Sequence, residues 1–315
     1  MPSPDSRLPS QREHACAPPS VLVLMATYNA GPWLDEQVNS VLAQEGVSVS
    51  ILVSDHGSND GTLERLEQRR AAGAPICVLP GVAQGRGSAA NFIRLLRQCN
   101  LGGVSHIALA DQDDVWLPQR LQRAISTMQS HGASAYSSDV LAIWPDGRET
   151  PVRKSQPQRR YDYLMEPAGP GCTYVLTAAL AGSLQQELLL APERFDAVHQ
   201  HDWLIYSYAR THGHPWVIDG FMGIRYRQHE GNEVGANVGL GGIRRRWNRA
   251  KSGIYRRELL HIGKLWPDAH ARVLARFERF APWDQLVIAL SALKLRRRPK
   301  DQLALFSMLL LGVLG

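Results

Sequence analysis

Short runs of apolar residues alternate with longer amphipathic segments through the first half of this chain. Four such runs lie at residues 20–26, 49–54, 76–79 and 106–110, and helix-like patterns lie between them. Strands that alternate with helices of roughly 10–15 residues indicate βαβ units, so the pattern predicts an α/β fold with a mostly parallel central sheet. Because each strand is apolar along its whole length, helices are expected on both faces of the sheet.

Polar side chains follow three of these strands at the point where each strand ends. Thr27 and Asn29 follow the first strand, Asp55 follows the second and Asp111 follows the fourth. In an open α/β sheet, ligands bind in the crevice outside the carboxyl ends of the strands. We therefore expect these four residues to meet at one edge of the sheet and to line a ligand site there.

An acidic cluster occupies the end of the fourth strand. The segment Asp111-Gln112-Asp113-Asp114 places three carboxylates within four residues, directly after an apolar run. Such a group is costly unless it is paired or binds a metal, and carboxylate oxygens suit a hard divalent cation such as Mg²⁺ or Mn²⁺. The alternative is an acidic start of a helix running from Val115, which the helix dipole would favour.

The second half of the chain supplies a candidate base. Asp202 stands beside Trp203 at the start of an apolar helix, where partial burial would raise its pKa toward a useful value. The alternative for Asp202 is a helix cap. His199 and His201 are interpreted as surface residues. A strand-like run also follows Gly-Pro-Gly-Cys-Thr at residues 169–173.

A Gly-rich motif at residues 85–90 matches the dinucleotide fingerprint GxGxxA but follows the third strand instead of the first, which disfavours a Rossmann oxidoreductase.

The four cysteines are scattered and form no CxxC pair, which is typical of a reduced, cytoplasmic protein. The N-terminus has no apolar core that could act as a secretory signal. Residues 1–18 are interpreted as a disordered leader.

Positive charge is concentrated in the C-terminal third. Residues 240–300 contain 16 Lys and Arg against 4 Asp and Glu, and the apolar segment DQLALFSMLLLGVLG follows them. That segment is too short to span a bilayer, and its basic neighbours suit the surface of an anionic membrane. The alternative is a helix that packs on the protein's own core. We expect no nucleic-acid partner.

Six segments together resemble family 2 glycosyltransferases of the GT-A fold, over roughly residues 20–235. They are VLMATYNA, VSDHGSNDGT, ALADQDDVW, GCT, HDW and YRQH. Within the family, the set is most similar to rhamnosyltransferases of cell-surface polysaccharide assembly. The resemblance implies a GT-A domain over residues 19–238, with a Rossmann-like nucleotide-binding half, and a basic helical region over residues 239–315.

On the donor side, the resemblance implies that Thr27, Asn29 and Asp55 hold the nucleotide of a nucleotide diphosphate sugar. Asp111 would approach the ribose and the diphosphate. The chain departs from many relatives by having His56 after Asp55. It also has Ala-Ala-Asn at residues 89–91 where many relatives have Ala-Arg-Asn, and Arg86 is the candidate substitute for that arginine.

On the reacting side, the resemblance implies that Asp113 binds a divalent metal, Mg²⁺ or Mn²⁺, and that His229 touches the metal or the diphosphate. Asp202 would be the general base that deprotonates the acceptor hydroxyl. Gly171 and Thr173 would line the acceptor side.

These roles together predict inverting sugar transfer, with dTDP-rhamnose as the expected donor and a glycan or lipid-linked acceptor. The expected location is the cytoplasm, at the inner face of the cytoplasmic membrane. Two alternatives stay open: a nucleotidyltransferase on a similar fold, and a non-catalytic membrane-surface adaptor. TYNAG after the first strand lacks the basic residue typical of nucleotidyltransferases, and the intact DQDD and HDW segments argue against an adaptor.

Overall fold

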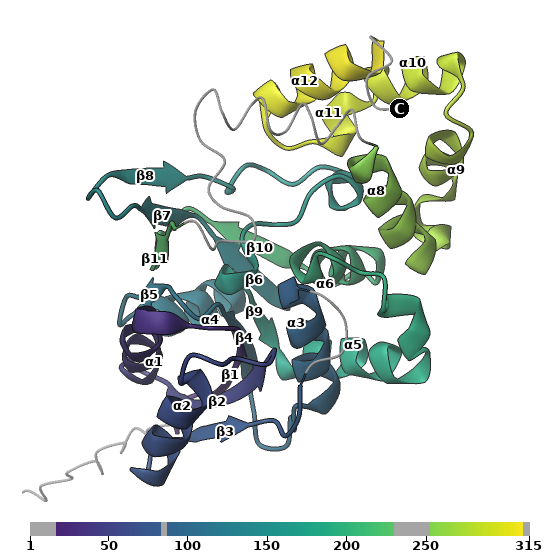
Figure 1. The fold of residues 1–315 in the computed structure, drawn as a ribbon. Helices are drawn as coiled ribbons and strands as arrows, with labels where there is room; N and C mark the ends of the chain where they lie inside the picture. Colours follow the sequence, from purple (N-terminus) through teal and green to yellow (C-terminus); the bar gives the residue numbers. More distant parts are fainter. Residues whose placement is uncertain (1–16, 83–86, 230–252, 311–315) are drawn as a thin grey trace, which may run out of the picture.

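A computed structural model describes residues 17–82, 87–229 and 253–310 of the chain. Its centre is a seven-stranded sheet in the order β10-β6-β9-β4-β1-β2-β3 (Figure 1). The strands of this sheet are β1 Ser20–Thr27, β2 Ser48–Asp55, β3 Ile76–Val78, β4 His106–Ala110, β6 Ala135–Ser138, β9 Val175–Thr177 and β10 Trp216–Asp219. The four strands expected from the sequence are present, each within one or two residues of its expected limits.

The central sheet is mixed and mostly parallel, as predicted. Strand β1 pairs in parallel with β2 on one side and β4 on the other, while β9 runs antiparallel between β4 and β6. Strand β1 is apolar on both faces because both are covered. Val23 and Met25 join the core beneath α1 and α4, and Leu24 joins the core beneath α3, α5 and α6.

A second sheet of four strands lies beside the first, in the order β5-β11-β7-β8. Its strands are β5 Val115–Trp116, β7 Val140–Ile143, β8 Glu149–Val152 and β11 Ile224–Arg227. The alternative of a helix starting at Val115 is therefore wrong. Val115 and Trp116 pair antiparallel with β11, and the following helix begins only at Arg120.

The helices form layers on both faces of the central sheet (Figure 1). They are α1 Leu34–Leu42, α2 Thr62–Ala71, α3 Gly87–Gln98, α4 Arg120–His131, α5 Ala178–Leu190 and α6 His201–Thr211. Short 3₁₀ helices connect the larger elements: η1 Gly31–Trp33, η2 Asp162–Leu164, η3 Gly171–Thr173 and η4 Pro192–Phe195. Residues 17–82 and 87–229 thus form a three-layered α/β structure.

Helices also make up the described part of the C-terminal region, at the top of Figure 1. They are α8 Ile254–Leu265, η5 Pro267–His270, α9 Ala271–Arg279, α10 Pro282–Leu290, α11 Ala292–Leu295 and α12 Pro299–Leu310. Helices α8 and α11 contact η2, and α8 also contacts α6, so this region packs beside α6 and η2. Across the described ranges, every helix is too short or too polar to cross a membrane.

Two expectations fall outside the described residues. They concern the leader up to residue 16 and Arg86 as the substitute for the arginine of relatives. The last five residues of the apolar C-terminal segment, 311–315, also fall outside.

Candidate functional site

The carboxyl ends of β1, β2 and β4 meet at one edge of the central sheet, as the sequence predicted. Thr27 and Asp55 stand opposite each other in the register of β1 and β2. Asp111 directly follows β4, whose last residue pairs with Met25. Three polar groups that lie far apart in the sequence are thereby brought to one edge.

Asp55 is buried in a tight network of hydrogen bonds. Its carboxylate accepts the Thr27 hydroxyl at 2.7 Å, the Ser58 hydroxyl at 2.6 Å, and the backbone N–H groups of Gly57 and Ser58 at 2.8 and 2.7 Å. Four donors keep the carboxylate in one place. The structure therefore shows what positions Asp55 and Thr27, while their contact with a nucleotide stays a prediction.

Asn29 holds two of the site's loops together. Its side-chain oxygen accepts the N–H of Asn59 at 2.9 Å, and its own N–H donates to the Ser58 hydroxyl at 2.8 Å. Its φ is +46°, in the left-handed region that asparagine tolerates better than most residues. Asn29 thus shapes the turn after β1.

Tyr28 and Gln112 form a contact that sequence reasoning missed. The Gln112 amide accepts the N–H of Tyr28 at 2.6 Å and donates to its carbonyl at 3.0 Å, which joins the ends of β1 and β4. The Tyr28 ring is 55% exposed and lies edge-on to His56, with 6.0 Å between ring centroids. An aromatic residue directly after the first strand was the available signal.

Asp113 and His229 lie side by side although 116 residues separate them in the chain. The Asp113 carboxylate is 2.7 Å from Nε2 of His229, and both side chains keep about a tenth of their surface exposed. Trp33 stacks on the imidazole at 4.1 Å between centroids. Arg227 donates through Nε to the Asp113 carbonyl and through a terminal nitrogen to Glu36.

This pair fits a hard divalent cation. A carboxylate oxygen and an imidazole nitrogen are both ligands that Mn²⁺ accepts, and they already converge at a partly exposed point. The pairing joins the two residues that the sequence proposed for the metal, and their coordination of an ion stays a prediction.

A second group of donor atoms lies deeper. Three possible ligand atoms lie within 4.8 Å of one another, one from each of Asp111, Asp114 and Cys172. Burial, and then the charges of Asp113 and Asp111, raise the pKa of Asp114 well above its usual value, and burial raises the pKa of the Cys172 thiol as well. A protonated thiol is a poor ligand for a hard cation, so this trio suits Mg²⁺ or Mn²⁺ less well than the Asp113–His229 pair.

Asp202 lies in the first turn of α6 with its side chain partly exposed. Burial raises the pKa of Asp202 to about 6, against the opposing effects of the Trp203 N–H and the Lys154 charge. The carboxylate accepts that N–H at 2.8 Å. The N-cap of α6 is Gln200, so Asp202 is not the helix cap that its spacing allowed.

Two other carboxylates of this region are held in ion pairs. Asp162 lies 2.9 Å from Arg210 and 3.3 Å from Arg297, and Glu166 lies 3.6 Å from Arg297. The side chain of Asp202 has no arginine partner in the part of the chain that the structure describes. Asp202 is therefore better able to exchange a proton than Asp162 or Glu166.

Gly171 and Thr173 form η3, next to the start of α6. A Cβ on Gly171 would come within 2.4 Å of Nε2 of His201, so only glycine fits. His201 is buried and stacks on Phe92, which corrects its interpretation as a surface residue. The Thr173 hydroxyl donates to the Pro170 carbonyl inside the protein. Gly171 and Thr173 therefore shape the region next to the start of α6, and their contact with an acceptor stays a prediction.

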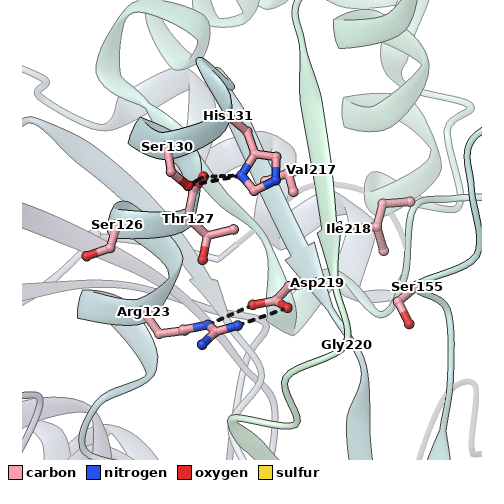
Figure 2. A pocket seen from close by; sticks show the side chains of 10 residues that line it. All are labelled: Arg123, Ser126, Thr127, Ser130, His131, Ser155, Val217, Ile218, Asp219 and Gly220. Carbon is pink, nitrogen blue, oxygen red and sulfur yellow. Dashed lines mark hydrogen bonds and ion pairs between the residues drawn. The ribbon is translucent and has the colours of Figure 1, made fainter.

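A separate surface pocket of about 650 Å³ lies between α4 and the edge strand β10 (Figure 2). Its polar groups are mostly hydroxyls, and its one ion pair joins Arg123 to Asp219 at 3.0 Å. None of the site residues expected from the sequence lines it. The site proposed from the sequence is therefore separate from this pocket.

The model of the glycosyl transferase family 2 matches residues 22–181. The dTDP-rhamnosyl transferase RfbG of Shigella flexneri is 35% identical over 92% of this chain and 100% of its own length. The Escherichia coli glucosyltransferase WfgD, named as using UDP-Glc and a GlcNAc-diphosphoundecaprenol acceptor, is 27% identical over 66% of this chain and 76% of its own.

Two solved structures share the fold at low sequence identity. TarS of S. aureus (residues 1–349), in complex with UDP-GlcNAc, aligns with a TM-score of 0.53 and 15% identity over 93% of this chain and 91% of its own. The mannosyltransferase PcManGT of Pyrobaculum calidifontis, in complex with GDP-Man and Mn²⁺, aligns with a TM-score of 0.51 and 14% identity over 95% and 86%.

Proposed function

The chain belongs to glycosyltransferase family 2, and we propose that it transfers rhamnose from dTDP-rhamnose to a hydroxyl group of a glycan or lipid-linked acceptor in cell-surface polysaccharide assembly. The observation that carries the choice of donor is the 35% identity to a dTDP-rhamnosyl transferase. That match covers the whole of the relative and nearly all of this chain, so it includes both the donor side and the acceptor side of the site.

In the proposed reaction, Asp202 is the general base. The acceptor hydroxyl oxygen bonds to the anomeric carbon, its proton passes to the Asp202 carboxylate, and the bond from that carbon to the phosphate oxygen breaks. The nucleoside diphosphate leaves with the electron pair of that bond. A single displacement with one base and no covalent nucleophile inverts the anomeric centre, and such a base contributes roughly 10²–10⁴-fold to the rate.

Asp202 suits this role because of its environment. Its pKa of about 6 leaves the carboxylate ionised at neutral pH yet more basic than an ordinary aspartate. The neighbouring acids Asp162 and Glu166 are held by arginines and lack that freedom.

On the donor side, Thr27, Asn29 and Asp55 would orient the nucleotide. The exposed ring of Tyr28 would stack on the nucleobase. Asp113 and His229 would hold a divalent cation, and Asp111 would face the ribose and diphosphate. When bound, the cation supplies positive charge against the leaving diphosphate. Arg227, which donates to the Asp113 carbonyl, would keep the pair in place.

A thermal-shift screen tests the donor assignment. Purified protein is heated with dTDP, UDP or GDP, each with Mn²⁺, Mg²⁺ or EDTA. A ligand at about 100 times its Kd stabilises the folded state by roughly 2.7 kcal/mol, which raises the Tm by several degrees. We expect the largest rise with dTDP and metal, and its loss in EDTA.

Variants locate the metal-dependent effect. Asp113→Ala should lose most of the metal-dependent part of the dTDP shift. Asp146→Ala, at an exposed turn residue that is not among the expected site residues, should retain it. A larger shift with UDP would retain the family and replace the donor. Release of inorganic diphosphate during turnover, instead of nucleoside diphosphate, would identify a nucleotidyltransferase.

A further inference from the structure

Large apolar side chains are exposed in one part of the C-terminal region. Among the described residues, ten large hydrophobic side chains are exposed, and five of these lie between residues 283 and 310. We call these five the C-terminal apolar face: Trp283, Leu290, Leu293, Leu303 and Leu310. A concentration of exposed apolar groups on a small part of a surface marks an interaction site more often than an ordinary surface does.

Helix geometry places these side chains opposite the protein's own core. Trp283 and Leu290 are seven residues apart, or two turns, and so share one side of α10, while Ile288 and Ala289 on the other side are buried. Helix α12 has the same arrangement, with Leu303 and Leu310 outside and its own buried leucines inside. Each helix therefore has an apolar inner side and an apolar outer side.

The two helices form one layer. Helices α10 and α12 pack against each other, α11 packs on both, and all three lie at the top of Figure 1. The stretch from Gln302 to Leu310 contains no charged residue. A helix that is apolar nearly all round is normally buried, yet here one side has no partner in the described chain.

The exposed charges next to the C-terminal apolar face are positive. Lys294 and Lys300 are exposed, while both acids between residues 280 and 310 are drawn into ion pairs. Asp284 is buried and lies 2.7 Å from Arg279, and Asp301 lies 3.6 Å from Arg296. An apolar face bordered by free lysines complements an anionic lipid surface, whereas a second copy would bring like charges together.

We propose that the C-terminal apolar face, with Lys294 and Lys300 at its border, docks on an anionic lipid bilayer. Tryptophan and leucine side chains would enter the interface, and the lysines would contact the lipid phosphates. Helix α12 has 12 residues in the structure and is far shorter than a membrane span, so this is attachment at the surface.

Docking there would place the reacting site close to the membrane. The buried Arg297, between α11 and α12, contacts Asp162 and Glu166, and the Lys294 carbonyl accepts the N–H of Tyr161. The face is thus firmly joined to the region that contains Asp202. The benefit of this docking for a lipid-linked acceptor rests on the proposed function, whereas the docking itself does not.

Vesicle flotation of the full-length protein tests the proposal. We expect binding to vesicles that contain phosphatidylglycerol and much weaker binding to vesicles of phosphatidylcholine alone. The double variant Leu290→Ser/Leu303→Ser should lower the bound-to-free ratio roughly tenfold or more, because two exposed apolar side chains no longer enter the interface. Lys294→Glu/Lys300→Glu should lower it by a similar factor at low salt.

The matched control is Leu189→Ser/Leu190→Ser, which removes an exposed leucine pair on α5, near the sheet in Figure 1. It should bind vesicles as the unchanged chain does. All variants should keep the thermal shift with dTDP and metal, which separates a failure of docking from a failure of the proposed function.

Two results would overturn the proposal. One is equal vesicle binding by the Leu290→Ser/Leu303→Ser variant and the unchanged chain. The other is a dimer in size-exclusion chromatography that this variant abolishes while the unchanged chain ignores vesicles, which would make a second copy the occupant.

Discussion

Asp202 is the residue on which the proposed reaction depends most, and its pKa gives the expected pH dependence. Because the base must be ionised to accept a proton, and burial raises its pKa to about 6, kcat/KM should fall about tenfold per pH unit below that value. A pH profile of turnover checks this. A plateau that continues to pH 4.5 would mean that an ordinary carboxylate or another group is the base.

Substitution of Lys154 tests the pKa of Asp202 in a second way. Burial raises the pKa of Asp202, and the positive charge of Lys154 lowers it in part. Lys154→Met should therefore move the acidic limb of the profile to higher pH, while Lys154→Arg should leave it nearly in place. An unshifted limb in Lys154→Met would mean that this charge does not act on the base.

Gly171 matters because of its contact with His201. A methyl group would meet Nε2 of His201 at 2.4 Å, so Gly171→Ala should destabilise the protein by about 1–3 kcal/mol. The control is Gly182→Ala inside α5, where the nearest side-chain atom is at 3.6 Å and alanine should stabilise by roughly 0.5–1 kcal/mol. Urea unfolding of both variants compares them. Equal stabilities would show that the imidazole moves aside without cost.

At the scale of elements, the C-terminal helices depend on one buried ion cluster. Arg297 is fully buried, with Asp162 at 3.3 Å and Glu166 at 3.6 Å. Arg297→Met leaves buried carboxylates short of a partner and should cost about 3–5 kcal/mol. Lys300→Met, at an exposed position, should change stability by no more than about 0.5 kcal/mol. A small loss of stability in Arg297→Met would mean that Arg210 and Arg296 are sufficient partners for the two carboxylates.

The elements that the sequence predicted well are those with local signals. Strands β1, β2 and β4 are continuous apolar runs that end in polar residues, and their limits match the expected ones closely. Their order alone placed Thr27, Asp55 and Asp111 at one edge, because parallel strands share a direction. The place of Asp202 in the first turn of a helix was also predictable, since an aspartate beside tryptophan at a helix start is a local pattern, while its role as the base stays a prediction.

The second sheet was not predictable in the same way. Strand β5 has two residues, and its pairing with β11 joins segments more than 100 residues apart. That pairing brings His229 to Asp113, which only the family resemblance suggested. Likewise, no local pattern indicates that His201 is buried against Gly171, or that Lys154 stands near Asp202. Contacts of this kind come from tertiary packing and not from periodicity.

At the scale of the whole molecule, the proposed donor and acceptor sides lie next to each other at the carboxyl edge of one sheet. The proposed nucleotide side is built on β1, β2 and the end of β4, while η3, which contacts β4, and the neighbouring α6 and η2 form the proposed acceptor side. The C-terminal helices pack on that acceptor side, where their outer face is apolar and bordered by lysines. A lipid-linked acceptor would thus reach Asp202 from the side at which the protein is proposed to meet the membrane.

The most direct test is transfer of labelled rhamnose from dTDP-rhamnose into lipid-extractable material. The acceptor source is membrane from the organism that encodes this chain, prepared from a strain lacking it. We predict metal-dependent incorporation with release of dTDP by the unchanged chain, and a loss of roughly 10²–10⁴-fold in Asp202→Asn with the dTDP thermal shift retained. No incorporation from dTDP-rhamnose, together with efficient transfer from a UDP-sugar, would contradict the rhamnosyl assignment.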